Sequence, residues 1–153
     1  MYQRILVPLD GSETAEHGFR EALALAADQK ATLFVLHVVA DFALLLEMSD
    51  AYNFEDMRKS LREYGLEVLA KARVAAQNAS VHAESLMREV EGERIGEVIV
   101  RQAEQHHCDL IVMGTHGRRG FSRVTLGSEA DWVIRHSPVP VLLVRKPGGE
   151  PTQ

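Results

Sequence analysis

Residues 110–128 read LIVMGTHGRRGFSRVTLGS and lead from an apolar run through a glycine-rich loop to the start of a helix pattern. The apolar run at residues 110–113 is typical of a fully buried strand. In doubly wound parallel sheets, ligands bind beyond the carboxyl ends of the strands, in loops that lead from a strand into a helix. This segment therefore indicates an α/β fold with a ligand site in the loop.

The rest of the chain repeats the alternation of strand and helix. Apolar runs predict strands at residues 5–9, 33–39 and 139–144, and a more polar strand at 81–90. Apolar residues spaced by three and four predict helices at 13–30, 57–78, 95–107 and 129–136. With short connectors, this alternation favours a single-domain open parallel five-stranded sheet with helices on both faces. Residues 40–54 are the exception, and we expect a mobile lid or partner surface with a short helical piece there.

Composition limits the function classes. The 153 residues suit one domain, which we expect over residues 1–146 with a flexible tail at 147–153. A net charge of −5, with no basic run longer than Arg118-Arg119, argues against general nucleic-acid binding. The single cysteine, Cys108, forms no internal disulfide and suits a reducing cytoplasm. We expect no signal peptide and no membrane span.

The loop has the features of a polyphosphate site. Its glycines allow positive φ angles and a close approach of an anion to backbone N–H groups. Arg118, Arg119 and Arg123 make it locally positive, and the helix expected to start at Ser128 favours a phosphate. Glycine spacing alone equally allows a structural turn, and residues 128–131 (SEAD) also fit a helix capping box.

The spacing Gly114-x2-Gly117-x9-Gly127-Ser128 resembles the nucleotide-binding signature G-x2-G-x9-G-[S/T] of universal stress proteins. The segments ILVPLDGSETA, LHVV, DLIVMGTHGRRG and SPVPVLLV are similar to the family in the same order. The resemblance covers nearly the whole chain and is loosest between residues 40 and 91. It implies a Rossmann-like sheet in the order 3-2-1-4-5, with ATP over the ends of the first and fourth strands.

Independent reasoning supports that placement. Asp10 ends the first predicted strand and Gly114 ends the fourth, and in this order the two strands are neighbours where the winding reverses. Carried over by position, the resemblance implies that the adenosine end is bound by Pro8, Asp10 and the backbone of Val38. It implies that Met113, Gly114, His116, Gly117, Gly127 and Ser128 lie along the ligand toward the ribose and phosphates. Asp10 is suited to accept hydrogen bonds from ribose hydroxyls.

Glu129 departs from the family, in which a small or apolar residue often follows the Gly-Ser pair. Its backbone N–H can still bind a phosphate, and an acidic residue in the first helical turn suits the dipole. A carboxylate directed at the phosphates would weaken binding or hold Mg²⁺. We expect the side chain to point away from them.

Other side chains favour structural roles. His106, His107 and Cys108 come before the fourth strand, at the end of the sheet opposite the expected site, so we expect no metal there. His37, inside a strand, is expected to be a hydrogen-bonded core histidine, and Trp132 a packing residue.

No GxSxG, HExxH or Walker A sequence is present, so no catalytic residue is assigned. The resemblance implies a cytoplasmic stress-response or signalling module that binds ATP, AMP or ADP. It also implies a homodimer through the last strand, an apolar edge strand. The alternatives are a slow ATPase or nucleotidyl-transfer enzyme on the same fold, and a nucleotide-free scaffold.

Overall fold

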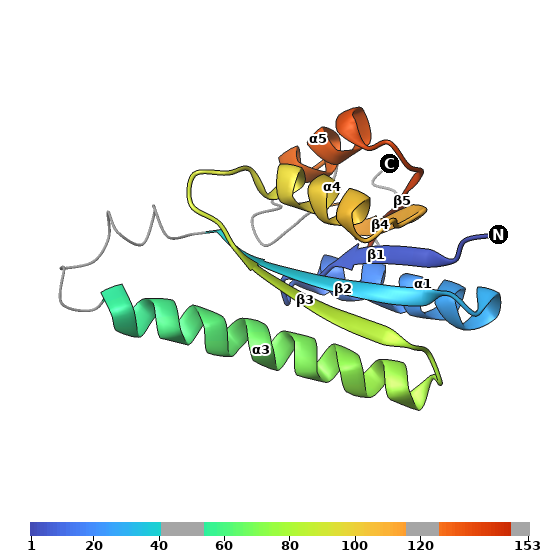
Figure 1. Cartoon of the computed structure of the whole chain (residues 1–153), viewed down its shortest axis with the longest axis horizontal. Helices are drawn as coiled ribbons and strands as arrows, with labels where there is room; N and C mark the ends of the chain where they lie inside the picture. Colours follow the sequence, from blue (N-terminus) through green and yellow to red (C-terminus); the bar gives the residue numbers. More distant parts are fainter. Residues whose placement is uncertain (41–53, 116–125, 148–153) are drawn as a thin grey trace, which may run out of the picture.

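A computed structural model of the chain describes residues 1–40, 54–115 and 126–147. In chain order the elements are β1 (Arg4–Pro8), α1 (Glu13–Gln29), β2 (Thr32–Val39), α3 (Phe54–Asn78), β3 (Ala83–Glu89), α4 (Ile95–Gln105), β4 (Leu110–Gly114), α5 (Ser128–His136) and β5 (Val141–Val144) (Figure 1). Within these residues the five strands form one parallel sheet in the order β3-β2-β1-β4-β5. The predicted fold class and strand order are confirmed. The expected lid and the tail fall on residues 41–53 and 148–153, outside the described residues.

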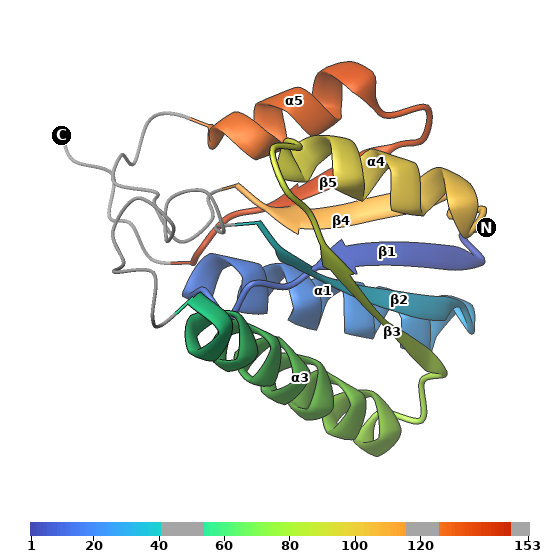
Figure 2. The ribbon, with the colours of Figure 1, turned by 60° about the vertical axis from the view of Figure 1, so that its left-hand side comes forward.

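Helices cover both faces of the sheet, with α1 and α3 on one face and α4 and α5 on the other (Figure 2). The alternation of side chains along a strand explains the two cores. In β1, Ile5 and Val7 pack with α1 and α3, whereas Leu6 packs with α4 and α5. All three side chains are fully buried, which is why the strand has a continuous apolar sequence.

The winding of the sheet reverses between β1 and β4. Ile5 pairs with Leu33 of β2 on one side and with Leu110 of β4 on the other. The helices that follow β1 and β4 in the chain, α1 and α5, lie on opposite faces of the sheet, which opens space above the carboxyl ends of the two strands.

Strand β5 is shorter than predicted. The sequence pattern predicts a strand over residues 139–144, but only Val141–Val144 is paired with β4. Pro138 and Pro140 lack the N–H that a ladder requires, although the carbonyl of Pro140 still accepts a bond of 3.0 Å from the N–H of Ile111. This strand forms one edge of the sheet, and Leu142 is 41% exposed on it.

The amino-terminal end of β4 is stabilised by protein contacts. The Asp109 carboxylate accepts hydrogen bonds from the N–H groups of Gln3 and Arg4, at 2.8 and 3.0 Å. Arg4 Nε donates to the carbonyl of His106 at 2.7 Å. Among the described residues no group of three His, Cys, Asp or Glu side chains is arranged to hold a metal ion. In this same part of the chain, no helix has both the length and the apolarity to span a bilayer.

The pH dependence of stability should reveal the buried Cys108. Burial raises the pKa of this thiol to about 11, whereas an unfolded chain loses the proton near about 8.5. Between these values the unfolded state binds fewer protons, so the free energy of unfolding falls as pH rises. Urea titrations from pH 8 to 10.5 should show a steeper decline for wild type than for Cys108→Ala. Parallel curves would contradict the buried thiol.

Candidate functional site

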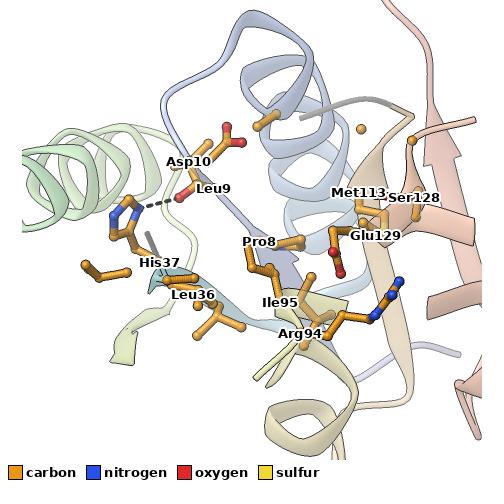
Figure 3. A pocket seen from close by; sticks show the side chains of 18 of the residues that line it. Pro8, Leu9, Asp10, Leu36, His37, Arg94, Ile95, Met113, Ser128 and Glu129 are labelled. Atoms are coloured by element: carbon orange, nitrogen blue, oxygen red, sulfur yellow. Dashed lines mark hydrogen bonds between the residues drawn. The ribbon is translucent and has the colours of Figure 1, made fainter. Parts of the chain in front are cut away.

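A cavity of about 490 Å³ lies above the carboxyl ends of β1, β2 and β4 (Figure 3). The first turns of α4 and α5 and the side of α3 close it. It contains every predicted site residue that the structure describes: Pro8, Asp10, Val38, Met113, Gly114, Gly127, Ser128 and Glu129. His116 and Gly117 lie outside the described residues. Sequence segments far apart in the chain are thus brought to one place.

Asp10 lies in the turn between β1 and α1. Its Oδ1 accepts a hydrogen bond of 2.8 Å from the N–H of Ser12, and Ser12 in turn caps α1 by accepting from the N–H of Ala15 at 3.2 Å. The second carboxylate oxygen has no hydrogen-bond partner within the described residues. Asp10 therefore combines a fixed orientation with one acceptor oxygen left for a ligand hydroxyl.

Gly114 lies where α1 packs closely against β4. A Cβ atom on Gly114 would lie 2.7 Å from the backbone oxygen of Thr14, and one on Gly18 would lie 3.1 Å from the N atom of Gly114. Both contacts are with backbone, which cannot easily move aside. Helix packing alone therefore requires glycine at the end of β4, whatever the loop binds.

Glu129 directs its carboxylate to helix α4. Its Oε2 accepts a hydrogen bond of 2.6 Å from the N–H of Gly96, in the first turn of α4, whose N-cap residue Arg94 supplies no side-chain cap. A Cβ on Gly96 would lie 3.0 Å from this oxygen and 3.0 Å from the Trp132 ring. Glu129 is thus a cap for the neighbouring helix, a charge-assisted bond that also suits the α4 dipole.

The capping-box interpretation of residues 128–131 is wrong. The N-cap of α5 is Gly127, which has no side chain, and Ser128 is already the first helical residue. The prediction that Trp132 is a packing residue is confirmed, because it packs against the core on this face and stacks on His136 with ring centroids 3.9 Å apart.

The start of α5 presents backbone N–H groups at the cavity wall. Gly127 N–H donates to the carbonyl of Thr115 at 2.8 Å, and the first intrahelical bond runs from Asp131 to the Gly127 carbonyl. The N–H groups of residues 128–130 have no acceptor within the described residues. Three adjacent donors at the positive end of a helix dipole suit an anion at the cavity wall.

Other cavity residues were missed by sequence reasoning. Arg94 and Ile95 come from the start of α4, and Leu61 and Tyr64 come from α3. Arg94 is the one Lys or Arg side chain on the described cavity wall, and it forms no ion pair within the described residues. The position of the start of α4 at the cavity could have been inferred from topology, since the carboxyl end of β3 lies at the same end of the sheet. Nothing in the sequence indicates the contribution of α3.

Charges at the β3–α4 connection are partly balanced by local pairs. Glu93, also on the cavity wall, accepts two hydrogen bonds from Arg101, of 2.9 and 3.1 Å. These bonds hold the pKa of Glu93 below its usual value. Its carboxylate therefore stays ionised and paired with Arg101.

Fold and cavity together define a doubly wound α/β domain with a ligand pocket at the point where the winding reverses. The sequence profile of the universal stress protein family matches residues 1–145, and the chain belongs to this family. It is 35% identical to universal stress protein MJ0531 of Methanocaldococcus jannaschii, over 98% of this chain and 86% of that protein.

Solved structures agree with this assignment. A universal stress protein family member from Burkholderia pseudomallei is 34% identical and superposes with a TM-score of 0.76, covering 94% of this chain and 96% of its own. A universal stress protein in complex with cAMP is 25% identical, with a TM-score of 0.67, covering 94% of this chain and 97% of its own.

Removing the Glu129 carboxylate should destabilise the fold. In Glu129→Ala the Gly96 N–H loses its acceptor, and loss of a helix cap typically costs about 1–2 kcal/mol. Glu97→Ala, an exposed acidic residue in the same turn of α4, is the matched control and should change stability by less than about 0.5 kcal/mol. Urea unfolding measures both. Equal effects of the two substitutions would show that Glu129 is not a cap.

Proposed function

We propose that this protein is an adenine-nucleotide-binding regulatory module that binds AMP, ADP or ATP in the cavity above β1 and β4. One observation carries the proposal: residues of four separate segments, chosen for nucleotide contact from the sequence, converge on a single cavity. The volume of about 490 Å³ is in the range of small-molecule sites. The related structure in complex with cAMP supports an adenine nucleotide as the ligand class.

The cavity offers a suitable environment for each part of a nucleotide. Apolar side chains on its α4 side, among them Leu36, Ile95 and Met113, suit the base. The unbonded oxygen of Asp10 suits a ribose hydroxyl, and the free N–H groups of residues 128–130 suit phosphate oxygens. This assignment follows the family pattern of Pro8, Asp10 and Val38 for adenosine and of Gly127 and Ser128 for phosphates.

Mg²⁺ would accompany ATP rather than occupy a site made by protein groups alone. The Glu129 carboxylate, the acidic group nearest the start of α5 in sequence, is hydrogen-bonded to Gly96. Mg²⁺ generally keeps several waters and is bound through one or two carboxylates and substrate phosphates. In the proposed complex the nucleotide phosphates and water, rather than protein groups, supply most of the Mg²⁺ ligands.

We propose that the bound nucleotide regulates partner binding in the cytoplasm during a stress response, and we assign no catalytic residue. The intact glycine signature favours this role over a nucleotide-free scaffold. Cys108, buried and without a disulfide, suits a reducing compartment.

Thermal unfolding tests the ligand class directly. Ligand at about 100 times its Kd should stabilise the folded state by about 2.7 kcal/mol, which raises the Tm by several degrees for a domain of this size. We expect this shift with Mg-ATP and AMP and not with GTP, in protein first shown to carry no co-purified nucleotide. The absence of a shift with every nucleotide would favour the scaffold alternative.

We also propose a homodimer that pairs β5 across a two-fold axis. The outer side of β5 has no neighbouring strand among the described residues, and Leu142 is 41% exposed there. Light scattering at micromolar concentration should give twice the 17.0 kDa of one chain, and Leu142→Lys should weaken the dimer. Leu66→Lys, at an exposed leucine of α3, is the control. A mass of one chain for wild type would contradict the dimer.

A further inference from the structure

We propose that His37 and Tyr64 are positioning residues for Asp10 and that they thereby set the selectivity of the site for a ribose over a deoxyribose. The inference rests on the proposed function, since it concerns how the same cavity recognises the sugar. Its basis is a pair of ring donors that hold two successive backbone carbonyls, those of Leu9 and Asp10, where the chain leaves β1.

The first donor is His37 of β2. Its Nδ1 lies 2.8 Å from the carbonyl oxygen of Leu9 (Figure 3). The residue is 5% exposed. Because a carbonyl only accepts, Nδ1 carries the proton in this bond. The N–H of Leu9 also donates to the carbonyl of Leu36 at 2.8 Å. Leu9 is therefore held through both of its backbone groups, and the prediction that His37 is a hydrogen-bonded core histidine is confirmed.

The second donor is Tyr64 of α3. Its hydroxyl donates to the carbonyl oxygen of Asp10 at 3.2 Å. The next residue, Gly11, has a φ of +83°, and a Cβ there would lie 1.9 Å from the Tyr64 hydroxyl oxygen. The phenol thus lies against the glycine backbone, and only glycine at this position allows both the turn and the contact.

The two rings depend on each other. Their centroids are 6.0 Å apart in an edge-to-face arrangement with an interplanar angle of 66°. A Cβ on Gly65, beside Tyr64, would lie 2.6 Å from Cδ2 of His37 and 2.6 Å from Cε of Met87. The glycine lets α3 approach the sheet closely enough for Tyr64 to reach the turn after β1.

This arrangement restricts the Asp10 carboxylate. Peptide planes on either side of a residue determine its φ and ψ, and both carbonyls at this point are held by side chains. With Oδ1 bonded to the N–H of Ser12, the direction of the remaining oxygen is fixed before a ligand arrives. A preorganised carboxylate discriminates strongly between a ligand that has a hydroxyl at that point and one that lacks it.

The test compares AMP with its 2′-deoxy and 3′-deoxy analogues by calorimetry. For wild type we expect a preference for AMP of about tenfold or more over at least one analogue, as for a hydrogen bond to a charged group. Tyr64→Phe should reduce that preference by at least about threefold and leave affinity for the less favoured analogue within about twofold. Tyr2→Phe, at the opposite end of β1, is the matched control and should change neither value.

His37 is tested by loss and rescue. His37→Leu removes the donor to Leu9 and should lower the AMP preference, whereas His37→Asn keeps a donor near Nδ1 and should restore most of it. In an Asp10→Ala background, Tyr64→Phe should have no further effect on the preference, although its effect on Tm should persist. That difference separates positioning of Asp10 from a general loss of stability.

The outcomes distinguish the two proposals. If wild type prefers AMP over a deoxy analogue and Tyr64→Phe leaves that preference unchanged, the positioning role is overturned. The nucleotide proposal then remains intact. Equal affinity of wild type for AMP and both deoxy analogues would have the same meaning. Wild type that binds none of the three would overturn both.

Discussion

The parallel pairing of β1 with strands on both of its sides is the constraint on which the rest of the structure depends. Because β2 and β4 run in the same direction as β1, the carboxyl ends of all three strands lie at the same end of the sheet. Each of these strands is followed in the chain by a helix, and the cavity at this end is lined by the first turns of α4 and α5. At the opposite end of the strands, the contacts of Asp109 and Arg4 tie the start of β1 to the segment before β4.

Glycine has more than one role in this site, which explains why a glycine motif alone is ambiguous. Gly114 is required because α1 packs against β4, and Gly96 because the Glu129 carboxylate and the Trp132 ring press against α4. Gly127 serves as an N-cap that leaves the first amides of α5 without an internal partner. Close packing thus requires glycine at Gly114 and Gly96, whereas Gly127 lies beside the helix N-terminus that we propose binds phosphate.

Much of the fold could be predicted because it follows from patterns local in sequence. Continuous apolar runs such as residues 33–39 identify buried parallel strands. The strand order comes instead from the resemblance to the family, and in that order the strands that end near Asp10 and Gly114 are neighbours. The contact of Glu129 with Gly96 joins residues 33 positions apart, and that of Tyr64 with Asp10 joins residues 54 apart. Neither contact changes any periodicity, so no local pattern predicts it. The predicted strand at residues 139–144 is too long because an apolar pattern does not show that Pro140 has no N–H to donate to a neighbouring strand.

The two ends of the cavity differ in how far their polar groups are already hydrogen-bonded within the protein. Around Asp10 the backbone carbonyls and one carboxylate oxygen are already hydrogen-bonded. Ligand binding there therefore loses little conformational entropy and favours a ligand with a matching hydroxyl. At the start of α5 the N–H groups of residues 128–130 have no acceptor within the described residues, and they suit any anion of fitting size. In the proposed complex, selectivity therefore arises mainly at the sugar and base, while phosphates add affinity. From the proposed complex we expect the module to distinguish nucleotides by their nucleoside and to tolerate a change in the number of phosphates.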